Sequence, residues 1–164
     1  MIVKKIFLLL CALFCLTSCA DFSKLVVSDL HINKVGSVEF SLGEVESTAD
    51  VIVTVGNPSA AITISQLKAD IKNNKGDNVL HLELADDEII TIAKRAVSEI
   101  EATFNINAPN ALSLLSLGLN SLGGGLQAKD YVVDYSAKIK SGLLSKTFIQ
   151  QSIPLEDLLK EQTK

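Results

Sequence analysis

Asp50-Val51-Ile52-Val53-Thr54-Val55-Gly56-Asn57-Pro58 is the stretch of sequence that decides the fold. Most of its residues before the glycine are β-branched aliphatics, and such side chains fit the pleated, packed surface of a sheet. Pro58 has no N–H to donate to a neighbouring strand, and it forces Asn57 out of the helical region of backbone space. The stretch therefore predicts a well-packed strand that stops at residues 56–59.

Apolar residues recur with a period of two on both sides of this stretch. The period is cleanest in 97–107, where Ile100, Ala102, Phe104 and Ile106 alternate with polar residues. The expected strands are 25–32, 38–42 (half-buried), 50–55, 60–71 (irregular near Ser65–Gln66), 79–84, 89–92, 97–107, 131–140 and 146–153, with a polar connection at 43–50 and a hairpin loop at 73–77. Strands at this spacing without a βαβ rhythm predict a mostly β, antiparallel sandwich or barrel.

One segment, residues 109–122, departs from this period. It begins with Pro109, a residue compatible with a helix start, and it ends at three glycines, 123–125. Its leucines at helical spacing are Leu112, Leu115, Leu119 and Leu122. We expect one short helix that covers the core first, and contacts a partner or lipid second. Residues 155–160 are expected to add one helical turn near the C-terminus.

The order of these features resembles the type 2 late embryogenesis abundant proteins, whose domain is also called the water-stress and hypersensitive-response domain. Their hallmark is an alternating strand that ends in Asn-Pro and is followed by a second strand; here these are Val51–Pro58 and Ala61–Ile64. The resemblance covers roughly 25–153, and the apolar segment at 109–122 departs from it. It implies an immunoglobulin- or fibronectin III-like β-sandwich without enzyme activity, linked to stress protection and binding.

The first nineteen residues have the pattern of a secretory signal. Lys4 and Lys5 precede an uncharged run, Ile6–Leu16, and no acidic residue occurs before Asp21. A bilayer core needs about 20 apolar residues as a helix, so this run is too short to span a membrane permanently. A basic start, a short apolar middle and small residues at the end predict a signal peptide over residues 1–18.

Leu16-Thr17-Ser18-Cys19 resembles the lipobox of bacterial lipoprotein precursors. In that family the cysteine sulfur takes a diacylglyceryl group, the chain is cut before the cysteine, and the new amine is usually acylated, with acyl chains such as palmitate. The resemblance implies lipidation of Cys19. The residues that follow predict a short lipidated tether over 19–24, and the strand pattern predicts a β-sandwich domain over 25–164. Two or three acyl chains anchor a protein stably, since each buried methylene contributes about 0.8 kcal/mol. In enteric bacteria, an Asp directly after the lipidated cysteine retains a lipoprotein in the inner membrane. The residue here is Ala20, so this resemblance implies the periplasmic face of the outer membrane over the inner membrane, with surface exposure as the open alternative.

Composition excludes several classes of site in the predicted mature chain. The three cysteines are Cys11, Cys15 and Cys19, so removal of the signal leaves no disulfide and no zinc-type cysteine cluster. Because Lys4 and Lys5 also leave, 13 of the 15 basic residues remain against 19 acidic ones, a net charge of −6. Such a chain is not expected to bind nucleic acid, and its net charge predicts no attraction to an anionic membrane.

Candidate reactive residues are few. His31 and His81 are the two histidines, and neither has another histidine or a cysteine at ligand spacing, so each is expected to be a surface or satisfied residue. Residues 86–88 are acidic, but lack the spacing of a calcium loop and are expected to form a solvated turn. No Gly-x-Ser-x-Gly occurs, and the glycines at 123–125 lack the residues of a phosphate loop. We therefore expect no catalytic residue, metal or cofactor.

Two functions follow as hypotheses. The first is a membrane-anchored, non-enzymatic lipoprotein of the bacterial envelope that binds an envelope protein or has a protective role under stress. The second is a carrier of a lipid or small apolar ligand, with residues 109–126 as a lid over an internal cavity. An enzyme ranks third.

Overall fold

The computed structural model describes residues 26–57, 59–111 and 128–160. The predicted signal peptide, Cys19 and the tether over 19–24 lie outside the described residues. So do Pro58, the glycines at 123–125 and the four leucines Leu112, Leu115, Leu119 and Leu122. The predictions made for these residues therefore stay predictions.

The described chain is mostly strand, as the alternating pattern predicts, and it contains one short α-helix. The elements are β1 (Val26–Val35), β2 (Glu39–Ser41), β3 (Glu44–Asn57), β4 (Ile62–Asn73), β5 (Asn78–Leu84), β6 (Ile90–Ile92), β7 (Ala96–Ala108), η2 (Ala128–Asp130), β8 (Tyr131–Ser141), β9 (Leu144–Pro154) and α3 (Leu155–Lys160). The helix has the bounds that the sequence predicts, whereas the 3-10 turn η2 was not anticipated.

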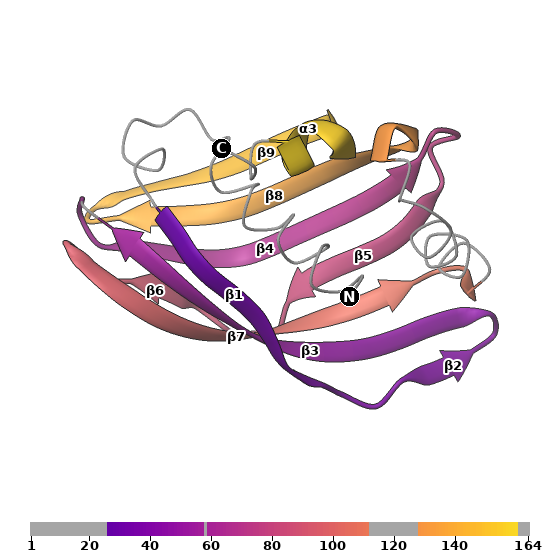
Figure 1. The fold of residues 1–164 in the computed structure, drawn as a ribbon, viewed down its shortest axis with the longest axis horizontal. Coiled ribbons are helices and arrows are strands. Elements are labelled where there is room, and N and C mark those ends of the chain that lie inside the picture. The colour runs from indigo at the N-terminus through magenta and orange to yellow at the C-terminus, as the bar shows by residue number, and fades with distance from the viewer. Residues whose placement is uncertain (1–25, 58, 112–127, 161–164) are drawn as a thin grey trace.

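All strand pairs in the described chain are antiparallel, and they form one connected sheet. The strand order is β1-β3-β7-β5-β4-β8-β9, with β2 beside β3 and β6 beside β4. In Figure 1, β1, β3 and β7 form one limb and β4, β8 and β9 form the other, and β5 lies between them. The two limbs are consistent with the layers of the predicted sandwich, but β5 pairs with both β4 and β7 and joins them into a single sheet.

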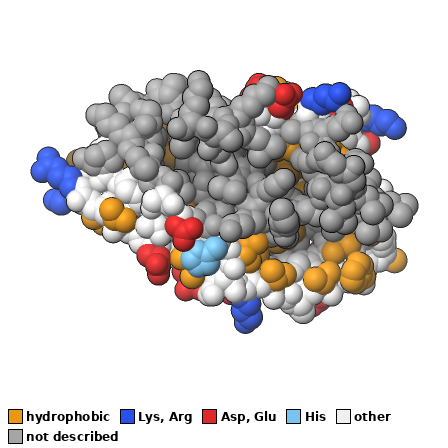
Figure 2. All heavy atoms as spheres, viewed as in Figure 1, with side chains coloured by type: hydrophobic (Ala, Val, Ile, Leu, Met, Phe, Trp, Pro, Cys, Tyr) orange, Lys and Arg blue, Asp and Glu red, His pale blue; other side chains and the backbone are white. Residues whose placement is uncertain are grey.

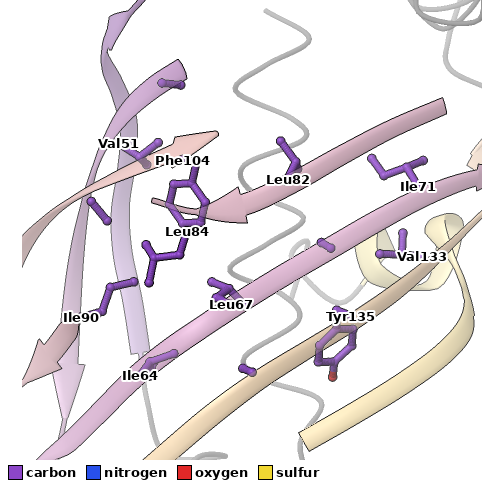
Figure 3. Close-up of a cluster of buried hydrophobic side chains, with 14 of the residues drawn as sticks. Val51, Ile64, Leu67, Ile71, Leu82, Leu84, Ile90, Phe104, Val133 and Tyr135 are labelled. Carbon is purple, nitrogen blue, oxygen red and sulfur yellow. The ribbon is translucent and has the colours of Figure 1, made fainter. Parts of the chain in front are cut away.

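The core lies on one face of this sheet. Val51 and Phe104 come from the first limb, Leu82 from β5, and Ile71 and Val133 from the second, and all five are at least 95% buried. Figure 3 shows these side chains gathered between the strands. Each such side chain contributes about 1.5–3 kcal/mol when it leaves water, so the shared core holds the two limbs together.

Two predictions in the first limb are wrong. The expected connection at 43–50 is instead the first half of β3, because Val45 and Ala49 face the core while Glu46 and Thr48 face solvent, and β7 pairs with all of them. The expected half-buried strand at 38–42 contributes only the three residues of β2, all exposed. That short strand pairs with β3 alone, at the margin of the sheet beyond the core.

Several local predictions are confirmed. The register of β4 against β8 shifts between Ser65 and Lys68, and Gln66 between them has a φ of 53°, which is the irregularity expected near Ser65–Gln66. The turn after β4 closes with the hydrogen bond from Gly76 N–H to the Asn73 carbonyl, and Gly76 takes a φ of 87° that favours glycine. Bulge and turn therefore follow from local composition.

The register fixes two opposite ends of the molecule. At one end, which we call the Val26 end, Val26 pairs with Gly56, and Asn57 pairs with Ala96 next to the β6–β7 turn. The β8–β9 turn lies at the same end, because Thr63 near the start of β4 pairs with Lys140. At the other end, the Val45 end, lie the β2–β3 turn, the β4–β5 turn and the end of β7. Figure 1 shows both ends of the sheet.

The two outermost strands carry features that block pairing with another chain. β1 has register shifts between Val27 and Asp29 and between Ile32 and Lys34, and β9 has one opposite Val133–Tyr135, where Ser152 has a φ of 57°. Bulges of this kind twist an edge away from a second strand. The edges of the sheet are therefore poor sites for the addition of a partner strand.

Asn57 ties the end of β3 to the loops around it. Its side chain is buried, and its Nδ2 donates to the carbonyls of Ala60 at 2.8 Å and Ala93 at 3.0 Å. Its Oδ1 accepts from the N–H of Ser59 at 2.9 Å. Asn57, at the end of the strand that the sequence predicts, thus has a structural role, because its side chain joins the β3–β4 loop to the β6–β7 turn.

Replacement of Asn57 by Ala should lower the free energy of unfolding by about 2–3 kcal/mol, because the partly buried hydrogen bonds to the Ala60 and Ala93 carbonyls and from the Ser59 N–H are lost. Urea denaturation measures this loss. Asn74→Ala, an exposed asparagine in the β4–β5 turn, is the matched control and should change stability little. Equal losses in the two variants would contradict the role of Asn57.

Candidate functional site

A cleft of about 600 Å³ lies beside the bulge in β4. Its walls come from the bulge, the end of β5, the turn at 85–89, and the facing parts of β8 and β9. The lining residues are Ser65, Gln66, Lys68, Glu83, Leu84, Ala85, Asp86, Asp87, Glu88, Ile89, Ser136, Ala137, Lys138 and Thr147. The cleft exists because β4 shifts register where β5 stops and β6 has not yet begun.

The acidic turn forms one wall of this cleft. Asp86 and Asp87 are exposed, as predicted for a solvated turn. Glu88 behaves differently, because its carboxylate accepts the N–H of Thr103 at 2.6 Å while the N–H of Ala85 donates to the Thr103 carbonyl at 2.8 Å. These two contacts satisfy the N–H and the carbonyl of Thr103 on β7, just beyond the point where the pairing of β5 with β7 ends. Glu88 is therefore a structural residue of the turn.

Two charged residues that line the cleft, Lys68 and Glu83, are paired with each other. Lys68 Nζ lies 2.5 Å from Glu83 Oε1, and this hydrogen bond holds the pKa of Glu83 below its ordinary value despite partial burial. The same carboxylate lies 3.5 Å from His81 Nε2. His81 Nδ1 in turn lies 2.6 Å from Asp70 Oδ1, so His81 is a satisfied residue, as expected.

A second ion pair lies on the same outer face of the sheet. Lys72 Nζ lies 2.5 Å from Asp134 Oδ2, and Ser152 N–H donates to Asp134 Oδ1 at 2.6 Å. Partial burial raises the pKa of Asp134, but the two hydrogen bonds and the Lys72 charge outweigh it, so the pKa lies below its ordinary value. The hydrogen bond with Asp134 raises the pKa of Lys72. This pair connects β4, β8 and the edge strand β9.

The chemistry of the cleft lining suits the binding of a polar group. The cleft lining contains three hydroxyl side chains and charges of both signs, but no histidine to activate a hydroxyl. Within the described residues, no three acidic, histidine or cysteine side chains come together as metal ligands. His31 lies apart on exposed β1, with Nδ1 3.2 Å from Asp29.

Sequence reasoning identified the parts of this cleft but not the cleft. The irregularity near Ser65–Gln66 and the acidic turn at 86–88 were both predicted, as separate features. Their proximity depends on the register of β4 against β5 and β8, which one sequence does not fix. None of the helices in the described part of the chain has the length and apolar character to cross a bilayer.

No protein-family model matches the chain, and no curated protein matches it. The resemblance to late embryogenesis abundant proteins therefore stays a prediction. Among solved structures, a protein from Archaeoglobus fulgidus matches at 15% identity and a TM-score of 0.38, covering 77% of this chain and 94% of that one. The Northeast Structural Genomics Consortium target SoR45 matches at 10% identity and a TM-score of 0.39, covering 83% and 86%.

A β-glucuronidase from glycoside hydrolase family 2 matches at 16% identity and a TM-score of 0.31, covering 74% of this chain but 11% of that one. At these identities and TM-scores the three likenesses do not bear on what this chain does.

The Lys72–Asp134 pair predicts a specific pH dependence. A carboxylate whose pKa is lowered by folding stabilises the fold above its unfolded pKa of about 3.9, and this contribution is lost as the pH falls through the lower folded value. Lys72→Met removes the partner and should reduce the loss of unfolding free energy between neutral and acidic pH. Urea denaturation across that range measures it.

Lys75→Met makes the same chemical change on the exposed β4–β5 turn, and should keep the acid dependence of the unmodified protein. Parallel pH profiles for Lys72→Met and the unmodified protein would show that the ion pair does not contribute.

Proposed function

We propose that this chain is a lipid-anchored, non-enzymatic protein of the bacterial cell envelope, with a binding or stress-protective role. The observation that carries the proposal is Leu16-Thr17-Ser18-Cys19 at the end of a basic and then apolar leader. The first described strand begins at Val26, seven residues after Cys19. A lipid on Cys19 would hold the β domain close to the bilayer, and Ala20 favours the outer membrane.

A binding role agrees with the chemistry of the domain. Lys68 and Glu83, which line the cleft, form an ion pair that holds their charges in place for structure. The exposed Asp86 and Asp87 and the nearby Lys138 leave charges of both signs at the cleft mouth. Such a surface fits an envelope protein or another polar partner. The late embryogenesis abundant resemblance adds the protective role as a proposal.

The carrier hypothesis is the second candidate, and Ala111 is the described residue that bears on it. Ala111 lies near the start of the predicted lid over residues 109–126. It is partly buried against the core, and its N–H donates to the Gly43 carbonyl at 2.8 Å. This contact favours core cover as the role of the segment's start. The described cleft has a largely polar lining, so an apolar ligand would need a different cavity.

Replacement of Cys19 by Ser tests the anchor. The variant should accumulate as an unlipidated, uncut precursor, because the sulfur that takes the diacylglyceryl group is gone. Globomycin-sensitive processing, metabolic labelling with palmitate and membrane fractionation measure this. Cys15→Ser inside the apolar run is the control and should be labelled and cut normally. A Cys19→Ser protein that is cut normally and stays with membranes would overturn the proposal.

Native mass spectrometry separates the two candidate functions. Gently purified protein of residues 20–164, exported without the lipid cysteine, should show the bare chain mass if the domain binds a protein or protects. A mass excess that disappears on denaturation would instead support a carrier. In that case charged replacements at Leu112, Leu115 and Leu119 should abolish loading while the β domain still folds.

A further inference from the structure

The β8–β9 turn exposes two neighbouring leucines to solvent. Leu143 is 102% exposed and Leu144 is 80% exposed. They follow Gly142, which has a positive φ, at the tip of the β8–β9 hairpin. Large apolar side chains at a hairpin tip contribute nothing to the core, and they cost solubility. A tip of this kind is suited to enter an apolar phase without any change in the sheet.

Basic side chains surround this tip. Lys140 and Lys146 flank it on β8 and β9, and Lys94 and Arg95 form the β6–β7 turn at the same Val26 end; all four are exposed. Lys146 Nζ lies over the ring of Phe148, 4.9 Å from its centroid. In Figure 2, basic side chains protrude at the left-hand end of the visible face, where Figure 1 places these turns.

Acidic side chains are set back from this end. The nearest ones in the β1–β3–β7 register are Asp29 and Glu99, both opposite Thr54, three residue rows from Asn57. Three rows of a strand correspond to about 10 Å, roughly one Debye length at physiological salt. In the second limb, the nearest acidic residues are Asp86, Asp87 and Glu88, in the turn that precedes Ile90 opposite Ile64. The β6–β7 and β8–β9 turns at the Val26 end therefore carry or adjoin basic residues and contain no acidic one, although the predicted mature chain has a net charge of −6.

We propose that the Val26 end docks on an anionic phospholipid surface, with Leu143 and Leu144 inserted among the headgroups and Lys94, Arg95, Lys140 and Lys146 against the phosphates. Amphipathic elements bind membranes by this combination of apolar insertion and charge attraction. The charge and the exposed leucines carry the proposal without any lipid on Cys19.

The reach of the chain selects the same end, in a step that rests on the proposed anchor at Cys19. Seven residues span at most about 25 Å, so Val26 lies within that distance of the bilayer. The 14 residues of β3 have a contour length of about 45 Å, which places the β2–β3 turn at the far end of the domain. That turn also exposes a leucine, Leu42, but among the acidic residues Glu39, Glu44 and Glu46.

Single tryptophans test the proposal, because the chain contains none. Leu143→Trp and Leu42→Trp place the same probe at fully exposed turn positions on the two ends. The full chain is added to vesicles of equimolar phosphatidylglycerol and phosphatidylcholine. We expect Leu143→Trp fluorescence to shift to the blue and to be quenched by brominated lipids, while Leu42→Trp keeps its emission in water.

Charge reversal tests the electrostatic part. The double variant Lys94→Glu with Lys140→Glu, made in the Leu143→Trp background, should lose most of the quenching. The Leu143→Trp protein without these charge reversals should also lose most of it when salt rises from about 0.1 to 1 M, because the Debye length then shrinks from about 10 to 3 Å. The matched control reverses two exposed lysines at the Val45 end, Lys75→Glu with Lys129→Glu, and should keep the quenching.

Vesicle flotation distinguishes docking from anchoring. A lipidated chain floats with vesicles of phosphatidylcholine alone, whether or not the tip inserts. Floating protein whose Leu143→Trp emission stays unchanged on anionic vesicles would overturn docking and leave the anchor standing. The proposed orientation would also be overturned if Leu42→Trp were quenched as strongly as Leu143→Trp, or if charge reversal left the quenching of Leu143→Trp unchanged.

Discussion

The pairing of β3 with β7 over thirteen consecutive residue pairs is the constraint on which the rest of the structure depends. It sets Val51 opposite Ala102 and Ala49 opposite Phe104 on the core face, and so fixes which side of both strands is buried. A slip of one residue would turn every one of these side chains to solvent. β1, β2 and β5 all take their position from this pair, and β5 then connects it to β4 and the second limb.

The sequence predicts the strands better than it predicts their neighbours. Period two in 97–107, the Asn57-Pro58 stop, the bulge near Gln66 and the turn at 73–77 are local signals, and the structure confirms those that lie in described residues. The joining of the two limbs by β5 is not a local feature, because it depends on the pairing of β5 with both β4 and β7. For the same reason the cleft beside the bulge could not be predicted, although its acidic turn and its irregular strand were.

The error at 43–50 has a different cause. Glu44, Glu46 and Asp50 dominate the composition there and indicate a loop, yet Val45 and Ala49 keep the alternation that a half-buried strand requires. Cross-strand partners satisfy the polar side: Asn107 donates to Glu46 at 3.1 Å, and Thr103 donates to Asp50 at 2.8 Å. A polar outer face is as normal for an antiparallel strand as an apolar inner one, so period carries more weight than mean polarity.

The net charge of the whole chain does not describe the charge at one end of the molecule. It sums over the whole chain, whereas attraction to phosphates depends on charges within about a Debye length of the surface. The two ends expose leucines to similar degrees, at Leu42 and Leu143, and differ in the sign of the charges around them. Bulged edges meanwhile make strand addition unfavourable at β1 and β9. Of the two ends of the sheet, the Val26 end has the charge that an anionic bilayer attracts, and this is the reason for the docking orientation that we propose.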